Sequence, residues 1–190
     1  MPSRHPNILT TETALLVLVD LQEPFLSTVE ARGRVVERCA LLAESALILN
    51  VPVVATTQYA KRMGGLIDAL ASVIDPASEP IDKMCFSCCG SEQFLQRLRE
   101  SDRRQILLAG IETHICVAQT ALDLLHHGYQ VHVAADAVSS RGMDRHKLGM
   151  EKIRDSGAIP CSAEQAVFEL LQQSDTAEFK KILGLVKGGG

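Results

Sequence analysis

The chain has 190 residues, 46% of them hydrophobic, and a formal net charge of -4 at pH 7. This length is enough for one domain with a buried core and short for two, so we expect residues 1–190 to form a single domain. The negative charge and the lack of any run of Lys and Arg argue against a nucleic-acid partner, because phosphate binding needs clustered basic side chains.

The first predicted element is a buried strand at 14–19, with the sequence ALLVLV. These six apolar residues end at an aspartate, so the stretch is too short to span a membrane, and no small-residue cleavage site follows it. We therefore expect a cytoplasmic protein without a membrane partner. In that compartment the six cysteines are expected to be free thiols.

Apolar runs alternate with amphipathic segments along the rest of the chain. The runs are continuous, which is typical of strands covered on both faces, and they lie at 51–56, 105–110, 130–135 and 158–161. Helices are expected at 31–49, 115–127, 144–156 and, peripherally, 175–187. The segment 64–80 is loop-rich with a short helix at 66–73, and the tail 187–190 is expected to be disordered. This order predicts an α/β fold: a three-layer, doubly wound, Rossmann-like parallel sheet with helices on both faces.

Three polar or reactive residues follow two of the predicted strands and a short segment between them. Asp20 ends the first strand, Lys83 follows a short segment near 82, and Cys116 lies beyond the strand at 105–110, where a helix begins. Ligands of open parallel sheets bind at the carboxyl ends of the strands, so these side chains are expected to converge. A thiol ionises more readily at a helix N-terminus or beside a cation, and a carboxylate can accept its proton. This set predicts acyl transfer.

Three motifs, in this order along the chain, resemble those of the isochorismatase-like cysteine hydrolases. They are VLVDLQEPF at 17–25, the lysine at 83, and LAGIETHICVAQTALDLLHHGYQVHVAADAVSSR at 108–141. The segment TTQYAK at 56–61 is similar to the isochorismatase domain-containing subgroup. The resemblance covers nearly the whole chain and implies a catalytic triad of Asp20, Lys83 and Cys116. It also implies a cis peptide bond between Ile111 and Glu112, which would aim the backbone N–H groups of Glu112 and Cys116 at an oxyanion.

The resemblance implies a hydrolase that cleaves a small amide, carbamoyl or ureido substrate through a thioester. Nicotinamidases of this family carry an Asp-x-His zinc motif, but residues 57–68, TQYAKRMGGLID, contain no histidine, so no metal is expected. No G-x-G-x-x-G follows the first strand, so no dinucleotide or other cofactor is expected. The family also implies a homo-oligomer, with the C-terminal helix as a candidate contact. Loop residues at the same edge are expected to form the substrate pocket: Gln22, Phe25, Gln58, Tyr59 and His114.

Other functions stay open. Isochorismatase-type hydrolysis of a vinyl ether fits the same family. Cys85 and Cys88 form a C-x-x-C pair, which a thiol redox protein could use, although no second pair follows at zinc-site spacing. We expect these two thiols and Cys89 to pack or to flank the pocket, with Phe86 in the core. A non-catalytic binding protein of the same fold would leave Cys116 as a small buried residue.

Overall fold

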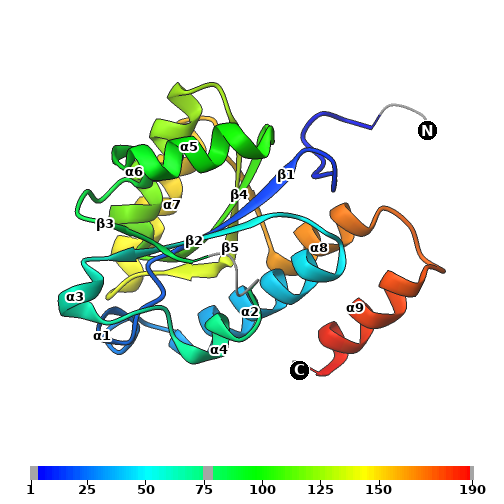
Figure 1. Ribbon diagram of the computed structural model, residues 1–190, viewed down its shortest axis with the longest axis horizontal. Helices are drawn as coiled ribbons and strands as arrows, with labels where there is room; N and C mark the ends of the chain where they lie inside the picture. Colours follow the sequence, from blue (N-terminus) through cyan, green and yellow to red (C-terminus); the bar gives the residue numbers. More distant parts are fainter. Residues whose placement is uncertain (1–3, 75–78, 189–190) are drawn as a thin grey trace.

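The computed structural model describes residues 4–74 and 79–188. Parts of two predictions, the loop-rich segment at 75–78 and the tail at 189–190, lie outside the described residues. A six-stranded parallel sheet forms the centre of the molecule (Figure 1). Its strands are β1 (Ala14–Val19), β2 (Val53–Gln58), β3 (Ile81–Lys83), β4 (Gln105–Ile111), β5 (Gln130–Ser139) and β6 (Ile159–Cys161). Their order, β3-β2-β1-β4-β5-β6, reverses between β1 and β4, where parallel sheets of this kind bind ligands.

Helices cover both faces of this sheet (Figure 1). One face packs against α2 (Arg32–Ile48), α8 (Ala163–Leu171) and α9 (Ala177–Gly188), and the other against α5 (Glu92–Ser101), α6 (Ala118–His126) and α7 (Met143–Asp155). Leu16 and Leu18 of β1 belong to the first core, and Leu15 and Val17 to the second, because successive side chains of a strand point to opposite faces. The predicted fold class is therefore confirmed.

Short helical elements lie along the chain between these larger ones. They are α1 (Glu23–Leu26), α3 (Ala60–Met63), α4 (Asp68–Ala71), a 3₁₀ turn (Cys88–Gly90) and a π-helical turn (Thr113–Val117). Helix α1 lies shortly after β1, the 3₁₀ turn follows β3, and the π-helical turn follows β4. These turns place loop side chains at the carboxyl ends of the strands, where the candidate site lies.

Several element boundaries differ from the prediction. The strand predicted at 51–56 begins at Val53, because the N–H of Val51 still donates to Ala46 O at the end of α2. Strand β5 runs four residues beyond 135, since a register shift after Leu108 lets its end pair with Gly110 and Ile111.

Two longer helices, α5 and α8, and the short helices α1 and α3 were not predicted. The two longer ones begin with a serine cap: Ser91 Oγ accepts from the N–H of Phe94, and Ser162 Oγ accepts from that of Gln165. The tail prediction is wrong for residues 187 and 188, which belong to helix α9.

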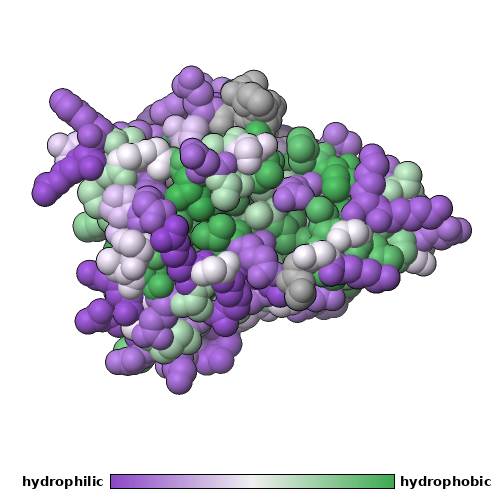
Figure 2. Space-filling model, turned by 90° about the horizontal axis from the view of Figure 1, so that it is seen from below, coloured by the Kyte–Doolittle hydropathy of each residue, from purple (hydrophilic) through white to green (hydrophobic). Residues whose placement is uncertain are grey.

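The side of the molecule that carries α2, α4 and α9 is shown in Figure 2, where apolar side chains lie at the surface between polar ones. In α9, Ile182 is buried against the core, and Phe179, Leu185 and Val186 are partly buried there. None of the described helices is both long enough and apolar enough to cross a membrane. The predicted subunit contact through α9 stays a prediction.

Acidic pH is expected to destabilise the protein through His132. This side chain lies on β5 with 1% exposure, and neither ring nitrogen has a hydrogen-bond partner among the described residues. Burial lowers its pKa, which nearby Glu169 offsets only in part. In the unfolded chain the ring takes up a proton near its ordinary pKa of about 6.5. The free energy of unfolding is therefore unaffected by His132 above this pH. Below it, the free energy of unfolding decreases by up to about 1.4 kcal/mol per pH unit.

Urea unfolding between pH 5 and pH 7 measures this effect. The His132→Leu variant is expected to show a shallower loss of stability toward acid than the wild type. His127→Gln, at an exposed position after α6, is the matched control and keeps the wild-type slope. If His132→Leu lost stability toward acid as steeply as the wild type, His132 would not be the source of the acid sensitivity.

Candidate active site at the carboxyl ends of the strands

Asp20 is the first residue after β1 and is held from two sides. Its backbone is left-handed, with φ 51°, a conformation that Asp tolerates better than most residues. One carboxylate oxygen, Oδ1, accepts from Thr56 Oγ1 at 2.8 Å, and the other, Oδ2, accepts from Lys83 Nζ at 2.7 Å. All three side chains are buried. The carboxylate is therefore fixed in orientation before any ligand binds.

Lys83 ends the short strand β3 and is surrounded by oxygen acceptors. Besides Asp20, its ammonium donates to Gln58 Oε1 at 2.9 Å and to the carbonyls of Cys85 and Phe86, both at 3.2 Å. Burial by itself would lower the pKa of Lys83, but the Asp20 carboxylate raises it above its ordinary value. The lysine therefore remains a cation throughout the physiological pH range.

Cys116 lies on the π-helical turn that leads from β4 into α6. Such turns are rare in proteins, and those that do occur are often found at functional sites. Helix α7 packs closely against this turn: a Cβ on Gly149 would lie 2.9 Å from the Cα of His114. The peptide bond between Ile111 and Glu112, just before the turn, is cis.

The Cys116 thiol is buried beside the carboxylate of Asp20. Burial and then the negative charge of Asp20 raise its pKa, and Lys83 offsets only part of this effect. In the free protein the group is therefore a thiol rather than a thiolate at neutral pH. Its proton has an acceptor at hand, because the Asp20 carboxylate lines the same cavity.

A small cavity of about 80 Å³ joins these groups. It is lined by Asp20, Phe25, Gln58, Phe86, Ile111, Glu112, Ile115 and Cys116. Lys83 is not part of its wall and contacts Asp20 from outside. The structure thus brings together the three residues that the sequence singled out, with the carboxylate and the thiol facing the same space.

Comparison with known proteins shows the family. A family model described as "Isochorismatase domain" matches residues 13–165. The chain belongs to the isochorismatase family. The secreted isochorismatase effector Isc1 of Phytophthora sojae is 39% identical over 184 residues, which cover 94% of this chain and 87% of that protein.

Solved structures of this fold agree with the assignment. A structure described as that of the MAR1 ribonuclease of Caenorhabditis elegans has a TM-score of 0.89 and 31% identity, and the match covers 94% of this chain and 92% of that one. The ycaC gene product of Escherichia coli, described as an octameric hydrolase of unknown specificity, also has a TM-score of 0.89. It is 22% identical, with 96% and 92% of the two chains covered, so this match shows the shared fold alone. The protein is an isochorismatase-family hydrolase.

Of the five predicted pocket residues in this isochorismatase-family site, only Phe25 and Gln58 line the cavity. Gln22 is fully buried and braces the loop instead: its Oε1 accepts from Gln58 N at 2.6 Å, and its Nε2 donates to Gly64 O at 2.6 Å. Tyr59 precedes α3 and is 37% exposed. His114 bonds Ser140 Oγ through Nδ1 at 2.9 Å, so its ring is held away from the cavity wall.

The segment after Lys83 also differs from the prediction. Phe86 is not a core residue: its side chain is 56% exposed and forms one wall of the cavity. Cys88 is fully buried, with Sγ 3.8 Å from Thr56 Oγ1, and burial raises its pKa to about 11. Burial likewise raises the pKa of Cys89 to about 12. These thiols are packing residues beneath the site, and Cys88 does not line the cavity.

Thr56 was not among the predicted site residues, and Glu112 was predicted only for its backbone N–H. Thr56 orients Asp20, and the only sequence signal for it was its place at the end of an apolar run. The Glu112 side chain lines the cavity, and its Oε2 accepts from the backbone N–H of Arg141 at 2.9 Å and from Arg141 Nε at 3.1 Å. Among the described residues, no group of three or more His, Cys, Asp or Glu is placed to hold a metal ion.

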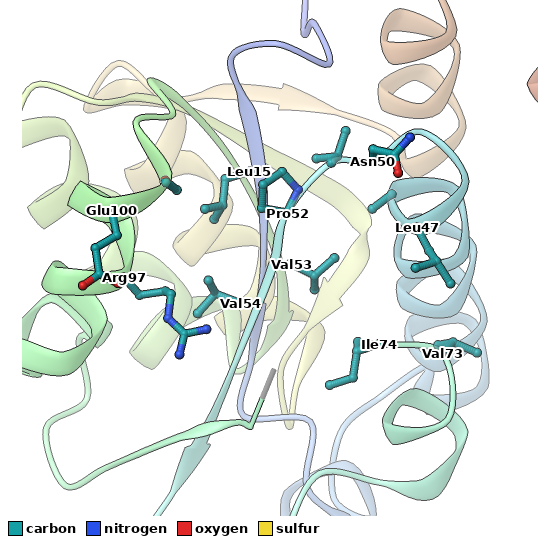
Figure 3. A pocket seen from close by; sticks show the side chains of 13 residues that line it. Leu15, Leu47, Asn50, Pro52, Val53, Val54, Val73, Ile74, Arg97 and Glu100 are labelled. Atoms are coloured by element: carbon teal, nitrogen blue, oxygen red, sulfur yellow. The ribbon is translucent and has the colours of Figure 1, made fainter. Parts of the chain in front are cut away.

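A larger cavity of about 430 Å³ lies away from this chemistry (Figure 3). Its wall includes Leu15 and Val54 from the early parts of β1 and β2, together with Leu47 near the end of α2. Arg97 and Glu100 of α5 supply its charged groups. It contains none of the three predicted catalytic residues, so its size does not make it the active site.

Proposed function

We propose that this isochorismatase-family hydrolase uses Cys116 to attack the carbonyl carbon of a small amide, carbamoyl or ureido substrate. One observation carries the proposal: Cys116 and Asp20 line the same cavity, and Lys83 holds Asp20 at 2.7 Å. A nucleophile, a base and a group that orients the base form the arrangement that covalent catalysis requires.

In the proposed mechanism Asp20 acts first as base and then as acid. Because the pKa of Cys116 is raised, the thiol gives up its proton to Asp20 as the bond to the carbonyl carbon forms. Asp20 passes the proton to the leaving nitrogen and later takes one from the water that cleaves the thioester. Lys83 stabilises the carboxylate, and the backbone N–H groups of Glu112 and Cys116 are proposed to bind the oxyanion.

The alternative functions have less support. A redox role for Cys85 and Cys88 would require an accessible thiol, and Cys88 is fully buried with a raised pKa. Two carboxylates, Asp20 and Glu112, line the cavity, which disfavours RNA as the substrate, although the similar Caenorhabditis elegans protein is described as a ribonuclease. The cavity of about 80 Å³ is also small for the ring of a cyclic vinyl ether. The homo-oligomer and the cytoplasmic location stay predictions.

Ammonia release from propanamide, with mass spectrometry of acid-quenched protein, tests the proposal. The wild type is expected to release ammonia and to carry an acyl adduct on Cys116. Cys116→Ala is expected to lower kcat/KM by at least about 10⁴-fold, because the nucleophile is lost. Cys88→Ala, the matched control for a neighbouring thiol outside the cavity, keeps both properties. Activity that survives in Cys116→Ala but is lost in Cys88→Ala would overturn the assignment.

A further inference from the structure

The cavity limits the size of the acyl group that Cys116 can reach. Its volume is about 80 Å³. A water molecule occupies about 30 Å³ in the liquid, so the cavity has room for an acyl group of about four to six heavy atoms. Drug-sized ligands need pockets of about 300 Å³ or more. The group next to the scissile bond is therefore short.

Most of the cavity wall is apolar. Phe25 comes from helix α1 and Phe86 from the loop after β3. Ile111 ends β4, and Ile115 lies on the π-helical turn. Phe86 is 56% exposed and stands at the wall without core packing around it. An alkyl group placed among these four side chains would remove apolar surface from water on both partners.

The charged groups on the wall are both carboxylates. Asp20 and Glu112 line the cavity, whereas no lysine, arginine or histidine does so among the residues that the structure describes. Two cations that contact the wall carboxylates are already engaged: the Lys83 ammonium faces four oxygen acceptors, and Arg141 binds Glu112. A substrate carboxylate would face two carboxylates whose cations are already paired, and no free cation on the wall would be available to bind it.

We infer that the substrate is an uncharged primary carboxamide with a short aliphatic acyl group, and that the site rejects acyl groups that carry a carboxylate. This inference rests on the proposed function and adds the substrate class. Asp20 and Glu112 supply the discrimination by charge, and Phe25 and Phe86 the preference for an alkyl group.

The chemistry balances without a further reactant. The Cys116 sulfur forms a bond to the carbonyl carbon, the carbon–nitrogen bond breaks, and the thiol proton leaves with the nitrogen as ammonia by way of Asp20. Water then forms the carbon–oxygen bond, the carbon–sulfur bond breaks, and a proton returns to sulfur. The product acid ionises at neutral pH, so the carboxylates that exclude anionic substrates also favour its release.

Two substrates that differ in charge but have nearly the same shape test the inference. Malonamide is neutral, and malonamate replaces one amide with a carboxylate of nearly the same size. The wild-type kcat/KM for ammonia release is expected to be at least about 100-fold lower for malonamate, because the charge faces Asp20 and Glu112. Propanamide is expected to exceed hexanamide, whose acyl chain is too long for the cavity.

Two variants test whether Glu112 causes the preference for malonamide over malonamate. Glu112→Gln is expected to narrow the ratio between malonamide and malonamate by about 10-fold, because one of the two repelling charges is removed. Glu92→Gln is the matched control: Glu92 is also paired with an arginine, Arg99, but lies on α5 outside the cavity, and the ratio stays at the wild-type value.

The outcomes separate the inference from the proposed function. If malonamate is hydrolysed as fast as malonamide in a reaction that Cys116→Ala abolishes, the substrate class is wrong and the proposed function stands. If no amide releases ammonia in a Cys116-dependent way, the proposed function fails and the inference fails with it. A wild-type preference for malonamide that Glu112→Gln narrows supports both.

Discussion

Lys83→Met is expected to lower the free energy of unfolding by about 3–5 kcal/mol, because it leaves the Asp20 carboxylate buried without its counterion. Lys83 and Asp20 are 3% and 2% exposed, and the bond between them is 2.7 Å long. Gln58 and two backbone carbonyls lose their donor as well. In the proposed mechanism the same change removes the cation that stabilises the base, so kcat/KM is expected to fall by at least about 100-fold.

Urea unfolding and two further variants check this result. The double variant Asp20→Asn/Lys83→Met is expected to be more stable than Lys83→Met alone, since no uncompensated buried charge remains. Arg32→Met is the matched control, because Arg32 forms an exposed pair with Glu23, and it is expected to cost less than about 1 kcal/mol. An equally small cost for Lys83→Met would contradict a tightly coupled buried pair.

The backbone positions of the site were predictable because they follow from strand periodicity. The continuous apolar runs identified β1 and β4 as strands buried on both faces, and the rule that parallel strands present their carboxyl ends at one edge then placed Asp20 and Cys116 together. For Lys83 the signal was weaker, since β3 has only three residues. The prediction of Lys83 as a catalytic residue rested mostly on the resemblance to the family.

Side-chain directions could not be predicted in the same way. Gln22 and Phe25 both follow β1, yet one turns inward to bond Gln58 and Gly64, while the other lines the cavity. Phe86 is strongly hydrophobic, but its own carbonyl accepts a hydrogen bond from Lys83 Nζ and its side chain is left exposed. Such outcomes depend on which backbone groups need partners in the folded chain, and periodicity does not contain that information.

Gly110→Ala is expected to lower the free energy of unfolding by more than about 4 kcal/mol or to prevent folding. Few single substitutions have so large an effect. The φ angle of Gly110 is +119°, a region that side chains other than glycine rarely adopt. A Cβ at this position would also lie 2.2 Å from Val19 O and 2.6 Å from Val19 N. These are backbone atoms of β1, which cannot rotate out of the way as a side chain could.

Two other glycines separate the strain from the clash. Gly128 has φ +82° with open space around it, so Gly128→Ala is expected to cost only about 1 kcal/mol for the left-handed conformation. Gly33 lies in α2 with an ordinary φ and open space, and Gly33→Ala is expected to change stability by less than about 1 kcal/mol. Urea unfolding ranks the three variants. A cost for Gly110→Ala no larger than that for Gly128→Ala would mean that β1 and β4 can separate freely.

The position of Gly110 also links this contact to the proposed chemistry. Val19 pairs with Gly110 in the sheet, Asp20 follows Val19, and Ile111 follows Gly110. The close approach of the two backbones therefore sets the distance between the strand end that carries the base and the strand end that leads to Cys116. If some Gly110→Ala protein folds, its kcat/KM on propanamide is expected to fall further than its stability explains, whereas folded Gly128→Ala keeps wild-type activity. Equal activity per folded molecule in both variants would show that the site tolerates a wider spacing of β1 and β4.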